Sequence, residues 1–323
     1  MVCKKVVAVV VITYNSAKTV VETLNSIVSQ TYGADFIELI ISDDASVDNT
    51  TNVIEDWLEQ HGSSFYSVMF FKNTVNLGVS GNVNVAWKTT TSEWVKTIAG
   101  DDILFPGCIC DNINYIKKAK DTCAVFSEME LFKVDGSGEN NIISTSPSEI
   151  IKSFFNLPAA EQFKKLCIGN FVPAPSSFIN INVLKNVGFA DERFKLIEDY
   201  PLWLKLTSSG YKLNFLDKKT VYYRISDSLS SNVTRLVNFN FFSSLNDVYA
   251  ACVYPKLKHN RTLLLQIKLT RMLTFFVAKI FKNEKNGLSV FMMRLIYLMS
   301  PKHVKSWGLI KDKIRSTLLF RGV

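Results

Sequence analysis

The chain has 323 residues, of which 47% are hydrophobic, and its formal net charge is +8 at pH 7. This apolar content argues against long disordered stretches, and the length predicts a main domain of roughly 230 residues with an appendage. The six cysteines form no CxxC pair, which argues against a cysteine-ligated metal class and a disulfide-rich class. The charge is uneven, because residues 256–323 carry 15 Lys and Arg against 2 acids.

The first hundred residues alternate between strand and helix patterns. A continuous β-branched run predicts a buried strand at 6–13, and apolar residues at helical spacing follow it. Further strands are predicted at 37–42, 67–72 and 93–99, with helices at 50–60 and 80–88. This alternation is typical of an α/β fold with a Rossmann-like, mostly parallel sheet and helices on both faces.

The pattern beyond residue 121 is mixed. We expect strands at 124–132, 178–180 and 213–224, a helix at 199–209, a polar loop at 135–148, and only helices from about 237 onward. The sequence therefore predicts an α/β domain over residues 1–235 and a basic, apolar helical region over residues 236–323.

Polar residues follow three of the predicted strands. They are Thr13, Tyr14 and Asn15 after the first strand, Asp43 and Asp44 after the second, and Asp101 and Asp102 after the strand that ends at Ala99. Ligands of parallel sheets bind at the carboxyl ends of the strands. Adjacent buried carboxylates repel each other unless a cation offsets their charge, so Asp101 and Asp102 predict a site for a metal-bound diphosphate.

Several motifs share one order along residues 5–230. They are Val-Val-Val-Ile-Thr-Tyr-Asn at 9–15, Ser-Asp-Asp-Ala-Ser-Val-Asp-Asn-Thr at 42–50, Asn-Leu-Gly at 76–78, Gly-Asp-Asp at 100–102 and Glu-Asp at 198–199. In this order and spacing the chain resembles the inverting glycosyltransferases of family 2, which have the GT-A fold. The resemblance implies that residues 1–235 form a catalytic domain that binds a nucleotide-sugar.

The resemblance also implies which residues bind the donor. They are Thr13, Tyr14, Asn15, Asp43, Asp44, Asn76, Gly78, Asn82, Asp101 and Arg224. Some of these have a structural alternative: Asp44 could cap a helix, residues 76–78 could be an ordinary glycine turn, and Arg224 could pair with a structural carboxylate instead of a phosphate.

Two acidic pairs would carry the chemistry. Asp102, with Asp101, is predicted to hold Mn²⁺ or Mg²⁺, and Asp101 faces either the ribose or a metal-bound water. Ala99 departs from the family, because a carboxylate often stands there. The resemblance makes one residue of the Glu198-Asp199 pair the general base that activates the acceptor hydroxyl, and we expect it to be Asp199. The alternative is that these acids only favour a helix start.

The resemblance further implies a UDP-sugar donor and transfer of a single sugar, since the Gln-x-x-Arg-Trp motif of processive members does not occur. The basic, apolar C-terminal region is expected either to rest on a membrane surface or to pack on the catalytic domain. We therefore expect a cytoplasmic, peripheral protein with a lipid-linked saccharide acceptor in surface polysaccharide or O-antigen synthesis. No nucleic-acid-binding motif accompanies the positive charge.

Two other classes stay open at this point. A sugar nucleotidyltransferase would also use acids and a metal on an α/β sheet, although residues 15–18 lack its Gly/Arg/Lys-rich loop. A noncatalytic membrane-associated scaffold would account for Ala99, and for Ser226 near the place where the family often has His.

Overall fold

The computed structural model describes residues 5–135, 138–225 and 235–301, which divide into two compact units. The first unit takes in the described residues through 164 and again from 171 to 225, and the second takes in 165–170 and 235–301. Ser226 lies outside the described residues. The expected domain boundary between residues 235 and 236 adjoins the same undescribed stretch, so this boundary stays a prediction.

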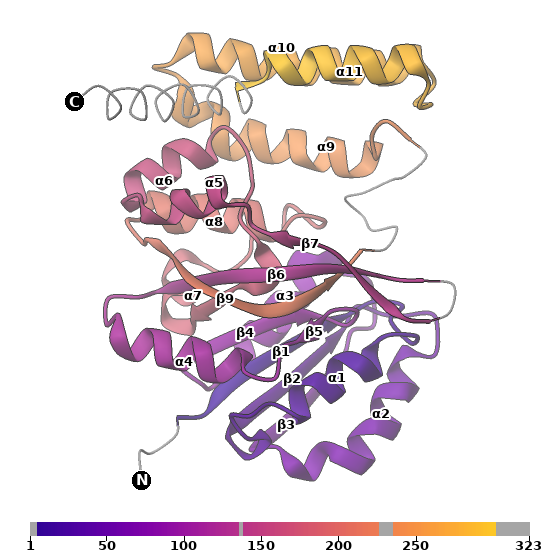
Figure 1. Cartoon of the computed structure of the whole chain (residues 1–323), viewed down its shortest axis with the longest axis vertical. Helices are drawn as coiled ribbons and strands as arrows, with labels where there is room; N and C mark the ends of the chain where they lie inside the picture. The colour runs from indigo at the N-terminus through magenta and orange to yellow at the C-terminus, as the bar shows by residue number, and fades with distance from the viewer. Residues whose placement is uncertain (1–4, 136–137, 226–234, 302–323) are drawn as a thin grey trace, which may run out of the picture. The chain divides into compact units, whose positions relative to one another are not determined.

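A mixed sheet forms the middle of the first unit (Figure 1). Its strand order is β3-β2-β1-β4-β8-β6-β9-β5, with β7 paired to β6. The strands are β1 Val7–Thr13, β2 Ile37–Asp43, β3 Ser67–Lys72, β4 Trp94–Ala99, β5 Ile103–Leu104, β6 Ala124–Val134, β7 Asn140–Ser146, β8 Phe178–Asn180 and β9 Leu213–Arg224. Strands β3, β2, β1 and β4 run parallel, so the carboxyl ends of β1, β2 and β4 lie at one edge.

Helices cover both faces of this sheet (Figure 1). Apolar residues of α1, Val20–Val28, α2, Thr50–His61, and α4, Cys108–Lys118, pack on one face in a buried cluster. Helix α3, Gly78–Thr89, lies on the opposite face. The unit also contains α5 Glu149–Lys152, α7 Ile181–Val187 and α8 Asp199–Ser208. Helix α6, Ala159–Leu166, crosses from this unit into the second one. The α/β architecture predicted from the alternating pattern is therefore confirmed.

The polar segment 135–148 differs from its prediction as a loop. Asn140–Ser146 forms β7, which pairs antiparallel with β6. Its side chains are mostly exposed, so the segment lacks the alternation of apolar and polar residues that identifies a half-buried strand. Backbone pairing with β6 makes this segment a strand, and a sequence pattern does not record that pairing.

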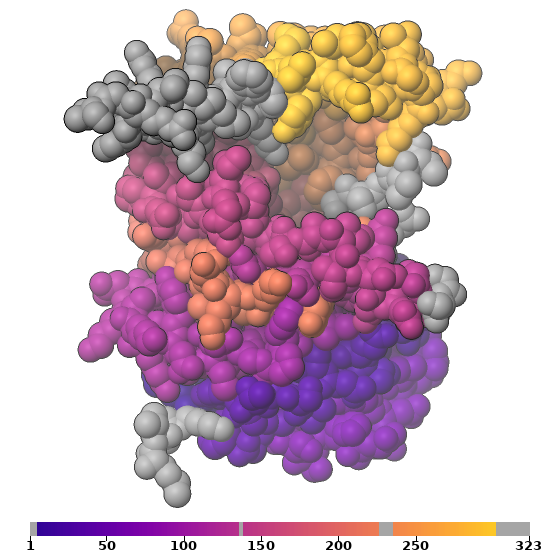
Figure 2. Space-filling model, viewed as in Figure 1, coloured from indigo at the N-terminus to yellow at the C-terminus, as the bar shows by residue number. Residues whose placement is uncertain are grey.

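The second unit is helical, as predicted. It contains α9 Phe239–Val248, a π-helical turn at Tyr249–Val253, α10 Arg261–Ile280 and α11 Gly287–Met299. Asn260 caps α10, and Asn286 with Ser289 forms a capping box at α11. Figure 2 shows the side chains of α11, in yellow, on the surface of this unit. Of the helices in the described ranges, none combines the length and hydropathy that a membrane-crossing segment requires.

Candidate active site

The acidic turn after β4 is held by the first helix. The hydroxyl of Thr19 donates to the carbonyl oxygen of Gly100, and the hydroxyl of Thr23 donates to that of Asp102, both at 2.7 Å. A Cβ on Gly100 would lie 2.8 Å from Cγ2 of Thr13, so only glycine lets the turn approach β1 this closely. The turn is thus fixed from both α1 and β1.

Arg224, at the end of β9, fastens the same turn from the other side. Its backbone N–H donates to Oδ1 of Asp102 at 2.9 Å, and its Nε donates to the carbonyl oxygen of Asp101 at 2.8 Å. Its guanidinium also pairs with Glu22 at 2.5 Å and stacks over the Phe132 ring, 4.6 Å from the ring centre. The structural ion pair that the sequence left as an alternative is therefore present, and a contact with phosphate stays a prediction.

The ionised carboxylates of Asp101 and Asp102 are destabilised by their surroundings. Burial, followed by repulsion from Asp101, raises the pKa of Asp102 well above its usual value, and burial also raises the pKa of Asp101. Only 1% of Asp102 is exposed. A divalent cation would relieve this repulsion, and carboxylate oxygens are ligands that Mg²⁺ and Mn²⁺ prefer. The pair therefore fits a metal site.

Within the described residues, no cluster of three or more His, Cys, Asp or Glu side chains is arranged to hold a metal. Mg²⁺ is often held in proteins by one or two carboxylates, with phosphate oxygens and water as its other ligands. Asp101 and Asp102 match that arrangement, so the remaining ligands would come from a diphosphate and from water.

The ends of β1 and β2 are joined through their last residues. Thr13 and Asp43 are register partners, and the Thr13 hydroxyl donates to the buried Asp43 carboxylate at 2.7 Å. The backbone N–H and hydroxyl of Ser46 donate to the same carboxylate at 2.9 and 2.6 Å. Asn15 and Ala45 have φ angles of 52° and 59°, a conformation that costs Ala roughly 1–2 kcal/mol and often marks functional loops.

The loop after β1 carries the other two predicted contacts of this group. Oδ1 of Asn15 accepts from the backbone N–H of Val47 at 2.9 Å, so Asn15 links the loops after β1 and β2. The side chain of Tyr14 is exposed over 51% of its surface. Thr13, Tyr14, Asn15 and Asp43 thus lie together at one edge of the sheet, and their contacts with a nucleotide stay predictions.

Asp44 meets the predicted loop at residues 76–78. Its carboxylate accepts from the backbone N–H groups of Leu77 and Gly78 at 2.7 and 2.9 Å, and its carbonyl oxygen accepts from the Asn76 amide at 3.2 Å. Gly78 has a φ of 76°, and a Cβ there would lie 2.6 Å from the carbonyl oxygen of Lys195. Asp44 therefore holds the start of α3, and not the helix that directly follows it in sequence.

Asn82 connects the same helix to the sheet. Its amide nitrogen donates to the carbonyl oxygen of Ser42 at 3.0 Å, and its amide oxygen accepts from the Ser42 hydroxyl at 2.6 Å and from Asn73 at 3.0 Å. The amide is thus engaged by the protein. Contacts of Asp44, Asn76, Gly78 and Asn82 with a donor stay predictions.

The second acidic pair lies at the start of α8. Asp199 is the first residue of this helix, and its carboxylate accepts from the N–H of Tyr200 at 2.6 Å. Burial, together with the charge of Asp199, raises the pKa of Glu198 to about 8. Burial and the charges of both acidic pairs, with Asp102 first among them, raise the pKa of the Tyr223 hydroxyl to about 12. Tyr223 is therefore close to all four carboxyl groups.

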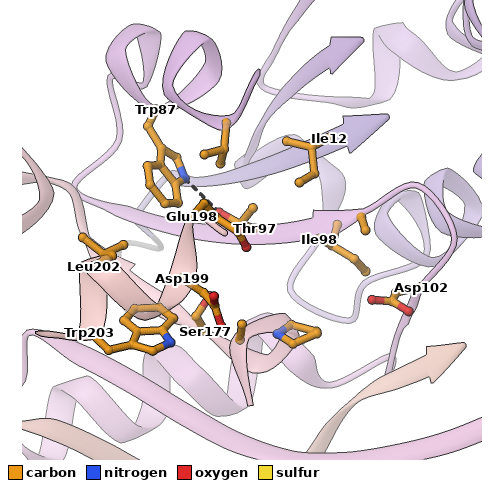
Figure 3. Close-up of a pocket in the computed structure, with 14 residues that line it drawn as sticks. Ile12, Trp87, Thr97, Ile98, Asp102, Ser177, Glu198, Asp199, Leu202 and Trp203 are labelled. Carbon is orange, nitrogen blue, oxygen red and sulfur yellow. Dashed lines mark hydrogen bonds between the residues drawn. The ribbon is translucent and has the colours of Figure 1, made fainter. Parts of the chain in front are cut away.

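One cavity brings the two acidic pairs together. Asp102, Glu198 and Asp199 all line it, and Figure 3 shows Asp102, in the turn after β4, and Asp199, at the start of α8, on its two sides. Its empty volume, which includes space open to solvent, is about 520 Å³. The structure thus places the predicted metal ligand and the predicted base at one site.

Two tryptophans that line the cavity, and a lysine that supports its wall, were not among the sequence predictions. Trp87 and Trp203 line the cavity. Lys96 is fully buried in β4, and its ammonium group donates to the carbonyl oxygens of Pro175 and Ser177. Burial lowers the pKa of Lys96 to about 8. The sequence signal that could have identified Lys96 is its place inside the apolar run 94–99, where a charged side chain is unusual.

Comparison with known proteins identifies the family. Residues 8–172 match the model of glycosyl transferase family 2. The chain is 25% identical over 229 residues to UDP-Glc:alpha-D-GlcNAc-diphosphoundecaprenol beta-1,3-glucosyltransferase WfaP of Escherichia coli, covering 71% of this chain and 81% of that protein.

Two solved structures have a similar fold. Staphylococcus aureus TarS 1–349 in complex with UDP-GlcNAc matches with a TM-score of 0.60 at 18% identity, covering 93% of this chain and 83% of that one. Mannosyltransferase PcManGT from Pyrobaculum calidifontis in complex with GDP-Man and Mn²⁺ matches with a TM-score of 0.53 at 15% identity, covering 99% and 80%. These matches confirm the predicted GT-A fold. The family match spans half of the sequence, so the chain belongs to glycosyl transferase family 2.

Proposed function

We propose that the protein transfers one sugar from a UDP-sugar to a hydroxyl of a saccharide acceptor and inverts the configuration at the anomeric carbon. The observation that supports this most strongly is the single cavity lined by both Asp102 and Asp199. An acid that can hold a diphosphate through a metal and an acid that can accept a proton are the two groups that such a displacement requires.

The donor would lie along the carboxyl ends of β1, β2 and β4. The exposed ring of Tyr14 is available to the nucleoside, beside Thr13 and Asp43, which are buried and hydrogen-bonded to each other. Asp101 and Asp102 would hold Mn²⁺ or Mg²⁺ against the diphosphate. When bound, the cation neutralises charge on the departing nucleoside diphosphate, a contribution of several kcal/mol at comparable sites. Arg224, the N-cap residue Thr19 of α1 and Thr23 within that helix keep the acidic turn in place for this task.

Asp199 would then accept the proton of the acceptor hydroxyl. As the proton leaves, the oxygen attacks the anomeric carbon from the face opposite the diphosphate, through a transition state with oxocarbenium character. Glu198 is the less suitable base at neutral pH, because its pKa of about 8 keeps it protonated. One displacement of this kind adds one sugar.

The acceptor we propose is a lipid-linked saccharide used in surface polysaccharide or O-antigen synthesis. WfaP, by its name, acts on a saccharide linked to diphosphoundecaprenol. In the second unit, α10 and α11 expose large apolar side chains, among them Leu265, Phe276, Ile280, Phe291 and Tyr297. Exposed Lys268, Lys279 and Arg294 lie on the same two helices. Apolar side chains beside basic ones suit the anionic inner face of a cell membrane, where the protein would sit peripherally.

A donor screen tests the reaction. The full-length protein is incubated with Mn²⁺, an acceptor lipid and a panel of UDP-, GDP- and dTDP-sugars, and released nucleoside diphosphate is measured. We expect turnover with a UDP-sugar, and losses of about a hundredfold or more in Asp102→Ala and Asp199→Ala. Asp121→Ala, which removes an exposed carboxylate that is not among the residues lining the cavity, is the matched control. Unaltered turnover in both site variants would overturn the proposal.

A further inference from the structure

The cavity contains a hydrogen-bond donor that the protein does not use. Within the described residues, the indole N–H of Trp203 has no hydrogen-bond partner, although only 2% of this side chain is exposed. A buried polar group without a partner is costly, and native proteins rarely retain one without a reason. Trp203 lies one helical turn after Asp199, and Figure 3 shows its ring nitrogen on the edge nearer to Ser177.

The other tryptophan of the cavity differs in this respect. The indole N–H of Trp87 donates to the hydroxyl oxygen of Thr97 at 2.9 Å, so it has no donor capacity left for a ligand. The cavity walls around these rings are mainly apolar, with Ile12, Val83 and Leu202 among them. A ligand group that fills this region should therefore combine an apolar part with one hydrogen-bond acceptor.

We propose that the cavity receives the N-acetyl group of a 2-acetamido sugar, with its carbonyl oxygen accepting from the indole N–H of Trp203 and its methyl group lying against the apolar walls. This inference rests on the proposed function and specifies its donor class. The acetamido group combines a carbonyl acceptor with an apolar methyl group, whereas a sugar hydroxyl offers an acceptor but nothing to fill the apolar space. The amide N–H can donate to the carboxyl group of Glu198, which lines the same cavity.

The test compares UDP-N-acetylglucosamine with UDP-glucose, and UDP-N-acetylgalactosamine with UDP-galactose, as donors for the full-length protein with Mn²⁺. We expect kcat/KM to favour one N-acetylated donor over its parent hexose by at least about tenfold, because the parent leaves the Trp203 N–H unpaired. Trp203→Phe removes the N–H and keeps an aromatic ring, so it should reduce that preference about tenfold.

Trp87→Phe is the matched control. It makes the same chemical change in the same cavity at an N–H that already has a partner, so it should keep the wild-type preference whatever its effect on the overall rate. A wild-type preference for the parent hexose, or an unchanged preference in Trp203→Phe, would overturn the inference and leave the proposed transfer reaction standing. Absence of turnover with every nucleotide-sugar would defeat the proposed function itself. If Trp203→Phe does not fold, the ratio of kcat/KM for the N-acetylated donor to that for its parent hexose, measured on the wild-type protein, still tests the inference.

Discussion

The backbone N–H of Arg224 donates a hydrogen bond of 2.9 Å to Oδ1 of Asp102, and the Arg224 side chain holds the neighbouring carbonyl group of Asp101. Residues 122 positions apart are thereby joined at the acidic turn. The strand that ends at Arg224 thus supports the carboxylates predicted to bind the metal.

Replacing Arg224 with Lys should reduce the free energy of unfolding by about 1–3 kcal/mol, because Lys cannot reproduce the Nε bond to Asp101 or the planar stacking on Phe132. Chemical denaturation measures the change. Glu22→Gln is the comparison: the Glu22 side chain is 51% exposed, so breaking its pair should cost at most about 1 kcal/mol. Equal costs in the two variants would contradict a specific role for the arginine.

Asp102→Asn should separate stability from metal binding. The asparagine keeps an oxygen for the Arg224 N–H but removes a buried charge, so the metal-free melting temperature should not fall. The rise in melting temperature that Mn²⁺ and UDP together give the wild-type protein should be lost, because the predicted ligand is gone. An identical thermal shift in the variant would remove Asp102 from the metal site. Asp121→Asn serves as the exposed control.

Glu198 predicts a defined dependence of stability on pH. Its folded-state pKa of about 8 lies above the ordinary value of 4.5, so the folded chain binds the proton more tightly than the unfolded chain does. The stabilisation is fully present below pH 4.5 and is lost as the pH rises through about 8. Metal-free thermal unfolding from pH 5 to 9 should therefore show a smaller decline in Glu198→Gln than in the wild type. Parallel curves would count against the burial of this carboxyl group.

Gly78 should tolerate substitution less well than Gly210, which also has a positive φ but has open space where a Cβ would lie. A Cβ at Gly78 would lie 2.6 Å from the carbonyl oxygen of Lys195, whereas nothing lies within 4 Å of a Cβ at Gly210. Their φ angles are 76° and 89°, so both Ala variants pay backbone strain of about 1–2 kcal/mol. Gly78→Ala should cost at least about 1 kcal/mol more in denaturation experiments. If the costs were equal, the contact with Lys195 would not be tight.

Local patterns predicted most of the first unit. The β-branched run at the start of β1 and the helical spacing in α2 identified those elements, because burial imposes a period that the sequence records. The two-residue strand β5 and the exposed strand β7 carry no such period, since pairing alone makes them strands. Family membership also removes the nucleotidyltransferase and scaffold alternatives.

The site was predictable to the extent that its groups follow strands. Asp102 was selected as an acid that follows a strand, and Asp199 was selected through the family resemblance; the structure places both at one cavity. The support of the turn by Thr19, Thr23 and Arg224 depends on contacts between distant segments, which one sequence does not reveal. The unpartnered state of the Trp203 N–H likewise follows only from side-chain packing.

The buried ammonium group of Lys96 bears on how the cavity would select among sugars. It anchors the backbone at Pro175 and Ser177 to β4, the strand that leads into the acidic turn. The ammonium group of Lys96 therefore connects a segment that lines the cavity to the strand that precedes the predicted metal ligands. We therefore expect this part of the wall to be preorganised and to select among sugars by their shape.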